Sequence, residues 1–394
     1  MPRSPRGPSP AERSPLCYSA PHMSDHPELP YWLALRRAGL GSTNFALLLA
    51  RFSTITAAWD ASVDDVTRAG LEGKYARAFA RARTTFDADA ELASLEKHGA
   101  RALTWLDEEF PAMLREIPQS PPVIFVRGAA GPQFSRAVAV VGTRHVTPYG
   151  RQATEHFCET LARNGVAIIS GLARGVDAIA HRVALENGAP TVAVLAGGID
   201  QVYPRENAGL AARILESGCL VSEYPVGIPA RPDYFPRRNR ILSGLATATL
   251  VVEAGEGSGA LHTANWALEQ NRDVFAIPGS VFSRQSAGTN QLIRENTARL
   301  VATPMQLCEE LNLLSASGQH ALPGPGSAAA QPAKVVQVTP AEGQVLHWLN
   351  DSPAHVDEIA RTSGMPVAAV SSTLQVLELK GVVRQNAPMT YSRI

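Results

Sequence analysis

Residues 137–144 read Ala-Val-Ala-Val-Val-Gly-Thr-Arg, an apolar run that ends in a glycine, a threonine and an arginine. Similar short apolar runs follow at 166–169, 191–195, 249–252 and 274–277, with helix-length amphipathic segments between them. Strands that are apolar at almost every position are buried on both faces, as in a parallel sheet covered by helices. The alternation of such strands with helices predicts an α/β fold with an extended Rossmann-like, doubly wound, mostly parallel sheet.

A glycine-containing turn follows most of these strands. The turns comprise residues 142–144, 170–175, 197–198 and 253–259. Ligands of doubly wound sheets bind at the carboxyl ends of the strands, and helix N-termini at such turns attract anions. Arg144 and Arg174 add positive charge, so the sequence predicts an anion-binding rim; the alternative is that the glycines only permit tight turns. The sequence contains neither Gly-x-Gly-x-x-Gly nor Gly-x-x-x-x-Gly-Lys-Ser/Thr, which argues against dinucleotide binding and P-loop ATP hydrolysis.

Residues 233–240 read Asp-Tyr-Phe-Pro-Arg-Arg-Asn-Arg, so two aromatic residues come just before three arginines and an asparagine. Unpaired bases stack on aromatic rings for about 1–3 kcal/mol each, and guanidinium groups bind phosphates. This segment therefore predicts binding of single-stranded nucleic acid, with a surface turn or a protein interface as the alternatives. The formal net charge of the chain is zero, so such binding must come from a local groove.

Two groups of residues are alternative candidates for catalysis. Ser170 precedes Asp177 and His181, which are four residues apart on a predicted helix, in a pattern compatible with a nucleophilic site. We expect structural roles instead: Asp177 complements the helix N-terminus, and His181 is an ordinary helical neighbour. Glu253 and Glu269 are candidate acids or bases beside the last glycine turn, although Glu253 can simply bind loop amides. We therefore assign no catalytic residue and expect that the protein is not an enzyme.

The four cysteines lie far apart and form no Cys-x-x-Cys pair: they are Cys17, Cys158, Cys219 and Cys308. We expect buried free thiols, with neither a metal site nor a cofactor. No segment approaches the ~18 consecutive apolar residues of a membrane span, and the N-terminus lacks the apolar core of a secretory signal. The sequence thus predicts a cytoplasmic protein.

The composition divides the chain into five parts. Residues 1–28, rich in Pro, Ser and Arg, are expected to be disordered, and residues 29–84 to form a helical domain similar to helix-hairpin-helix modules. Residues 85–312 hold the Rossmann-like, DNA-binding sheet, and residues 313–336, rich in Gly, Pro and Ala, form a flexible linker. Three helical segments and two short strands predict a winged helix in residues 337–394.

Both small domains carry weaker signals for nucleic-acid binding. The turn 39–42 reads Gly-Leu-Gly-Ser, as in helix-hairpin-helix modules whose amides approach phosphates. Lys74, Arg77 and Arg81 share one face of a later helix, where a solvated surface is the simpler interpretation. The expected recognition helix of the winged helix is basic only at Lys380, so protein contact is at least as well supported as DNA contact.

The order of these motifs resembles that of the DNA-processing protein A (DprA/Smf) family. The matching segments are 137–144, 170–177 with His181, 203–204, 222–225, 235–240, 258–259 and 278–279. The resemblance covers nearly all of the chain from Leu29 onward and implies a sterile-alpha-motif-like (SAM-like) domain, an extended Rossmann domain and a winged helix. It also implies a protein, typically a homodimer, that binds single-stranded DNA, protects incoming DNA in natural transformation and helps load the RecA recombinase. Single-strand-binding protein is a further candidate partner.

The same resemblance implies a set of DNA-contacting positions. They are Gly142, Arg144, Gly171, Arg174, Gly175, Phe235, Arg238, Asn239, Arg240, Gly257, Ser258 and Gly259. Thr143 and Thr147 stand where the family often has serine, which preserves the hydroxyl group. Residues 295–297 read Glu-Asn-Thr in place of the usual Gly-Ala, so the chain departs from the family pattern there.

Two alternatives stay open. The sheet and its late glycine turn at 253–259 resemble lysine-decarboxylase-like nucleotide-processing enzymes, although those carry Pro-Gly-Gly-x-Gly-Thr where this chain has Glu-Ala-Gly-Glu-Gly-Ser-Gly. The other alternative is a pure adaptor function through the winged helix, after Lys334. It predicts partner binding that is lost when the residues after Lys334 are deleted.

Overall fold

The computed structural model describes residues 26–313, 339–349, 353–380 and 382–393. The chain divides into two compact units, with the division between Gln319 and His320. Most of the expected N-terminal extension and nearly all of the expected linker lie outside the described residues.

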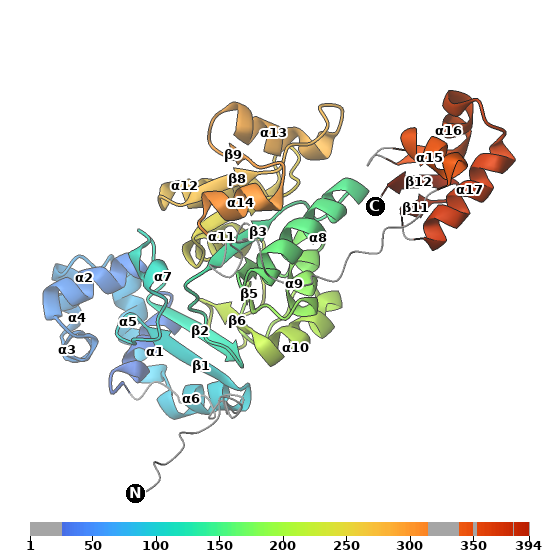
Figure 1. Ribbon diagram of the computed structural model, residues 1–394. Coiled ribbons are helices and arrows are strands. Elements are labelled where there is room, and N and C mark those ends of the chain that lie inside the picture. Colours follow the sequence, from blue (N-terminus) through green and yellow to red (C-terminus); the bar gives the residue numbers. More distant parts are fainter. Residues whose placement is uncertain (1–25, 314–338, 350–352, 381, 394) are drawn as a thin grey trace, which may run out of the picture. The chain divides into compact units, whose positions relative to one another are not determined.

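A nine-stranded sheet forms the centre of the first unit (Figure 1), in the order β1-β2-β6-β5-β4-β3-β7-β8-β9. Its strands are β1 (Ala100–Thr104), β2 (Val123–Gly128), β3 (Ala137–Val141), β4 (Ala167–Ser170), β5 (Thr191–Val194), β6 (Cys219–Ser222), β7 (Ala248–Val251), β8 (Asp273–Ala276) and β9 (Arg299–Leu300). All neighbours pair in parallel except β2, which is antiparallel to β1 and β6. The predicted doubly wound, mostly parallel sheet is confirmed.

The strands β1 and β6, and the two-residue β9, were not among the predicted ones. The strand β6 has only four residues, and β1 reads Ala-Arg-Ala-Leu-Thr, which is poor in β-branched and aromatic residues. Both strands depend on tertiary pairing: β1 pairs with β2 at five positions, and β6 lies between β2 and β5. Local sequence therefore gave no clear signal for them.

Helices cover both faces of the sheet. One face packs against α8 (Pro148–Arg163), α9 (Val176–Glu186), α10 (Ala208–Ser217) and α14 (Pro304–Glu310), and the other against α7 (Ala112–Glu116), α11 (Tyr234–Gly244), α12 (Gly259–Glu269) and α13 (Ala287–Arg294). Short 3-10 turns precede α10 at η1 (Arg205–Asn207) and α13 at η2 (Arg284–Ser286). The predicted start of α8 is confirmed, because Thr147 accepts a hydrogen bond from the Gly150 amide and Pro148 is the first helical residue.

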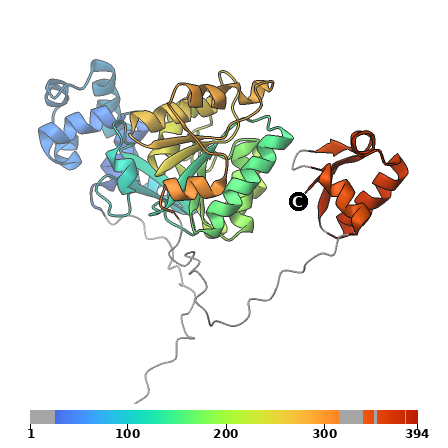
Figure 2. The same ribbon diagram turned by 45° about the horizontal axis from the view of Figure 1, so that its top comes forward.

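Six further helices lie at the β1–β2 end of the sheet, where Figures 1 and 2 both show them. They are α1 (Leu29–Arg37), α2 (Ser42–Phe52), α3 (Ile55–Asp60), α4 (Val63–Arg68), α5 (Gly73–Thr85) and α6 (Ala88–Lys97). Trp32, Phe45 and Phe79 are fully buried, in the same hydrophobic cluster as Val123 and Phe125 of β2. The helical region is thus joined to the sheet by a continuous core, and its boundary at residue 84 stays a prediction.

The second unit is a winged helix. It contains α15 (Pro340–His347), α16 (Val356–Ser363) and α17 (Val367–Leu379), with a three-stranded sheet in the order β10 (Ala354–His355), β12 (Thr390–Arg393), β11 (Val383–Ala387). Thr339 and Glu342 form the predicted capping box of α15. Lys380, the one basic residue expected on the recognition helix, donates to both carboxylate oxygens of Glu342 at 2.8 Å. This pairing further weakens the case for a DNA-reading helix.

Among the described residues, no helix has the length and apolar character needed to cross a bilayer.

Candidate nucleic-acid interface

An open pocket of about 1160 Å³ lies at the carboxyl ends of β3 and β7. Its walls come from residues 142–145 after β3, residues 255–259 after β7, one face of α11, and residues 284–287. Strand β4 lies on one side of β3 and β7 on the other, so this is the point where the strand order reverses. Ligands of open α/β sheets bind at such a point. The volume exceeds the about 300–1000 Å³ of ordinary small-molecule sites, which favours a larger ligand.

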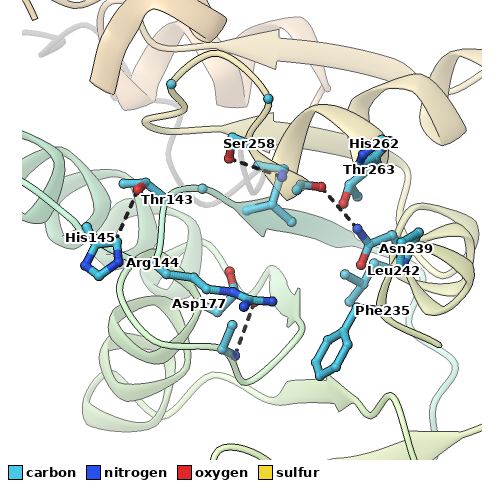
Figure 3. Close-up of a pocket in the computed structure, with 18 of the residues that line it drawn as sticks. Thr143, Arg144, His145, Asp177, Phe235, Asn239, Leu242, Ser258, His262 and Thr263 are labelled. Carbon is cyan, nitrogen blue, oxygen red and sulfur yellow. Dashed lines mark hydrogen bonds between the residues drawn. The ribbon is translucent and has the colours of Figure 1, made fainter. Parts of the chain in front are cut away.

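The loop after β3 supplies the exposed charge of the pocket. The Thr143 amide donates to the Glu253 carbonyl at 2.7 Å, which joins this loop to the end of β7. Arg144 is exposed, and its guanidinium carbon lies 5.4 Å from the centre of the Phe235 ring. Figure 3 shows Thr143 and Arg144 facing Phe235 and Asn239 of α11 across the pocket, with Ser258 on a third side. An exposed cation therefore lies beside an accessible aromatic ring.

A second aromatic ring extends this surface. The rings of Tyr203 and Phe235 are 5.6 Å apart at 66°, and Tyr203 is 53% exposed. We call these two rings the aromatic shelf. A notch of about 40 Å³ lies beside it, lined in part by Arg144 and Arg174. Tyr203 was not among the predicted DNA contacts, although an aromatic residue in the loop after β5 is a signal that could have identified it.

Arg174 is exposed but neutralised. Its Nε and Nη2 donate to the two carboxylate oxygens of Glu206, each at 2.7 Å, and both side chains are more than half exposed. This pairing raises the pKa of Arg174 and lowers the pKa of Glu206. Exposed ion pairs stabilise a protein little, so a phosphate can replace Glu206 as the partner of Arg174.

Arg238 occupies the floor of the pocket and is only 4% exposed. Its Nη1 donates to the Gly171 carbonyl at 2.9 Å and to the Val194 carbonyl, while its Nε donates to Asn239 at 3.2 Å. A Cβ at Gly171 would lie 2.5 Å from the guanidinium group, so only glycine permits this approach. Burial lowers the pKa of Arg238 to about 10. The expectation of a surface phosphate contact needs correction: Arg238 mainly ties the loop after β4 and the end of β5 to α11.

Asp177 balances the charge of Arg238. It is buried and accepts hydrogen bonds from the amides of Gly171 at 3.1 Å and Ala173 at 3.4 Å. Burial raises the pKa of Asp177, while the nearby Arg238 and the two amides oppose that rise. Asp177 therefore binds the loop that precedes its helix, in addition to lying in the first turn of α9.

The alternative nucleophilic site does not form. The Ser170 hydroxyl donates to the Val140 carbonyl at 2.6 Å. His181 is fully buried, with its Nδ1 at 2.7 Å from the Thr191 hydroxyl oxygen. Because that hydroxyl donates to the Ile168 carbonyl, His181 donates through Nδ1–H. Burial lowers the pKa of His181 to about 3, so the ring is neutral.

The two candidate acid–base glutamates also lie outside the pocket. Glu253 is 1% exposed and accepts hydrogen bonds from the Thr147 amide at 2.9 Å and the Thr147 hydroxyl at 2.6 Å. Glu269 lies at the far end of α12. The prediction that Glu253 binds loop amides fits this geometry.

The loop before α12 forms an open wall of the pocket. The Ser258 hydroxyl accepts from the Ala260 amide at 3.4 Å and caps α12. A Cβ at Gly257 or Gly259 would meet no atom within 4 Å, so this wall leaves space for a ligand. The Gly259 carbonyl accepts from Asn239 at 3.2 Å, which holds the loop to α11. The helix N-terminus favours an anion here.

Two of the predicted DNA contacts, Gly175 and Arg240, lie outside the pocket and its notch. Gly175 has φ +74°, and a Cβ there would lie 2.3 Å from the Thr143 carbonyl oxygen, so this glycine packs one loop against another. Arg240 is 8% exposed and donates to Glu223 at 2.8 Å in a separate groove. The structure therefore brings most of the predicted residues to one pocket or its notch, but not Gly175 or Arg240.

Comparison with known proteins agrees with this architecture. Residues 101–312 match the family model of DNA recombination-mediator protein A, and residues 327–387 match the DprA winged helix domain. The chain belongs to the DNA recombination-mediator protein A family. The resemblance inferred from the motifs is thereby confirmed.

Relatives in this family align over most of their length. Protein Smf of Escherichia coli is 40% identical over 295 residues, which cover 74% of this chain and 77% of that protein. Protein Smf of Synechocystis is 32% identical over 396 residues, covering 93% and 99%. The crystal structure of DNA processing protein A from Streptococcus pneumoniae has a TM-score of 0.64 at 32% identity and covers 71% of this chain and 97% of that chain.

Proposed function

We propose that this chain binds single-stranded DNA in the pocket at the carboxyl ends of β3 and β7. The observation that supports this proposal is the gathering of exposed Arg144, the Arg174 notch and the aromatic shelf around one opening. In this arrangement a base stacks on Phe235 or Tyr203, and a neighbouring phosphate binds Arg144. The amides at the start of α12 provide a further anion contact.

The chemistry of the pocket favours unpaired DNA over a duplex. Base faces are accessible to the aromatic shelf only when the bases are unstacked. Stacking and phosphate contacts read no base edges, so the binding tolerates any sequence. The charge is local, because the whole chain has a formal net charge of zero. Affinity should accordingly fall steeply as salt increases.

The wider role is part of the same proposal. The protein holds incoming single strands during natural transformation and helps load the RecA recombinase onto them, without catalysing a reaction. It does so as a homodimer, with single-strand-binding protein as a further partner. These partners are supported by family membership, and the non-catalytic role by the structural hydrogen bonds of Ser170, His181 and Glu253.

The proposal is tested by fluorescence anisotropy with a labelled oligo-dT strand. Wild type should bind the strand, be competed by unlabelled single strands of any sequence, and be competed poorly by duplex. Arg144→Ala should weaken binding about tenfold, the size of one charge-assisted contact. Arg163→Ala is the matched control, because Arg163 is exposed on α8 away from the pocket.

Three outcomes would contradict this proposal. One is equal binding by wild type and Arg144→Ala. A second is binding that is unchanged by every pocket variant but lost when residues after Lys334 are deleted, which favours the adaptor alternative. The third is release of free base from a nucleoside monophosphate, which favours the lysine-decarboxylase-like alternative.

A further inference from the structure

Helix α11 presents two aromatic and cationic faces. At about 100° per residue, Phe235, Arg238 and Asn239 share the face toward the pocket described above. Tyr234, Arg237 and Arg240 lie on the other side of the helix and line a separate groove of about 640 Å³. We call the pocket at β3 and β7 the first pocket and this groove the second groove.

The second groove lies at the same edge of the sheet as the first pocket. Glu223 and Tyr224 follow the carboxyl end of β6, and Pro122 precedes β2, which runs antiparallel to β6. Gly39 and Gly41 of the turn after α1, with residues 42–44 of the first turn of α2, form the opposite wall. A strand that leaves the first pocket over the N-terminal turn of α11 therefore enters the second groove without changing the edge of the sheet.

The charge of the second groove is positive. Its lining includes four arginines and two glutamates: Arg36, Arg37, Arg237, Arg240, Glu72 and Glu223. Glu223 accepts from both Arg36 at 3.5 Å and Arg240 at 2.8 Å, so one carboxylate serves two guanidinium groups. Arg237 is exposed and makes no ion pair within the part of the chain that the structure describes. Arg37 is already paired with Glu91 at 2.7 Å, so the unbalanced charge lies on Arg237 and on the two arginines that share Glu223. An anion would complete this balance.

Arg240 provides an independent sign of a ligand. The residue is 8% exposed, yet its Nη1 has no hydrogen-bond partner among the described residues. A buried guanidinium N–H without an acceptor costs free energy, so native structures usually satisfy it. Arg240 lines the second groove, but this Nη1 has almost no accessible surface, so a phosphate there would supply the acceptor oxygen once the guanidinium group turned toward the groove.

The opposite wall offers backbone donors. Helix α2 has 11 residues and begins after Gly41, which provides no side-chain cap for the first amides. A Cβ at Gly39 or Gly41 would meet no atom within 4 Å, so a ligand can approach this turn closely. The N-terminus of α2 and Arg240 therefore provide two separate anion contacts within one groove.

Aromatic rings line the second groove, as they line the first pocket. Tyr224 and Tyr234 are stacked, with ring centres 4.1 Å apart at 15°. Tyr75 and Trp266 also line the second groove and are partly exposed. Aromatic rings interleaved with arginines suit the alternating bases and phosphates of a single strand better than an isolated phosphate.

We infer that the second groove holds the continuation of the single DNA strand that occupies the first pocket. The inference rests on the proposed function, because it extends the same strand across α11. The turn 39–42 and Arg240 do not line the first pocket, and in the second groove they would contact the strand. The N-terminal helices then contribute directly to DNA binding.

The test is a length series of oligo-dT strands, from about 4 to about 16 nucleotides, the span of typical single-strand sites. Thr43→Glu places a carboxylate in the exposed first turn of α2, where it favours the helix but repels a phosphate. Thr43→Gln is the matched uncharged control. Arg237→Ala removes an exposed cation, and Arg163→Ala is its control outside both sites.

We expect Thr43→Glu and Arg237→Ala to bind the shortest bound strand like wild type and the longest strand about tenfold more weakly. For the long strand, the slope of log affinity against log salt should fall by about 0.7 with Arg237→Ala. Both controls should match wild type at every length.

The outcomes separate the two proposals. If wild type binds no strand of any length, the proposed function fails. If wild type binds but Thr43→Glu and Arg237→Ala match it at every length, the second groove holds no DNA. Equal weakening for short and long strands would also overturn the inference, because the second groove would not act on the continuation alone.

Discussion

Both faces of α11 carry aromatic residues and arginines. On each face one arginine is buried: Arg238 binds the loop after β4 and the end of β5, and Arg240 binds Glu223. The cations that remain accessible are different residues, Arg144 at the first pocket and Arg237 at the second groove. A run of arginines therefore divides into residues that hold the frame and residues that can meet a ligand, and burial decides which is which.

The largest effect expected from this comparison is on stability. Arg238→Ala removes two main-chain hydrogen bonds and leaves Asp177 buried without its opposing charge, so the free energy of unfolding should fall by about 3–5 kcal/mol. Urea denaturation measures this loss. The neighbouring Arg237→Ala is the control and should change stability by less than about 0.5 kcal/mol. If both variants lost the same free energy of unfolding, Arg238 would not stabilise the fold more than the exposed Arg237 does.

The next effect is on affinity alone. Phe235→Ala should weaken oligo-dT binding by about 1–3 kcal/mol, because a base loses its stacking partner. Phe235→Tyr keeps the ring and should bind like wild type. Anisotropy titrations compare the two variants, with circular dichroism to verify folding. Full affinity in Phe235→Ala would show that no base stacks on Phe235.

The buried side chain of His181, on α9, should make stability depend on pH. The pKa of His181 is about 3 in the folded protein against 6.5 ordinarily, so the unfolded chain alone takes up a proton as pH falls below 6.5. The contribution of His181 is therefore complete above pH 6.5 and is lost as pH falls toward 3. Between pH 7 and pH 5 the loss is about 2 kcal/mol.

Urea denaturation of wild type and His181→Gln at both pH values isolates this contribution. The glutamine can still donate to Thr191 but does not titrate, so the variant should lose about 2 kcal/mol less than wild type over the same interval. Identical pH dependence in the two proteins would mean that His181 is not held neutral.

The smallest expected effect is on DNA affinity and concerns Arg174, which is paired with Glu206 beside the notch. Glu206→Gln frees Arg174 from its exposed ion pair, so affinity for oligo-dT should rise by about two- to threefold. The rise should disappear in the double variant with Arg174→Ala. An unchanged or lower affinity in Glu206→Gln would indicate that Arg174 does not meet the strand.

Much of this architecture could be predicted from local sequence. Apolar strands followed by glycine turns indicated the sheet and the edge where the first pocket lies, and Thr147 with Pro148 indicated the start of α8. The short strands β1 and β6 could not be predicted, because their partners come from distant segments.

It was also not predicted that residues 233–240 divide between two faces of one helix, and the reason is different. Read as a linear segment, Arg238 and Arg240 belong to one cluster, whereas the helical period places them on different faces of α11. That part could have been deduced from the sequence once the segment was taken as a helix. Gly171 and Val194, which bind Arg238, are 67 and 44 residues away in the chain, and Glu223 is 17 residues from Arg240, so only the fold brings these partners close.

The central claim is tested most directly by a crystal structure of the protein with an oligo-dT strand. We expect a base against the ring of Phe235 or Tyr203, a phosphate at Arg144, and Arg238 unmoved beneath them. A strand bound only to the winged helix, with the first pocket empty, would contradict it.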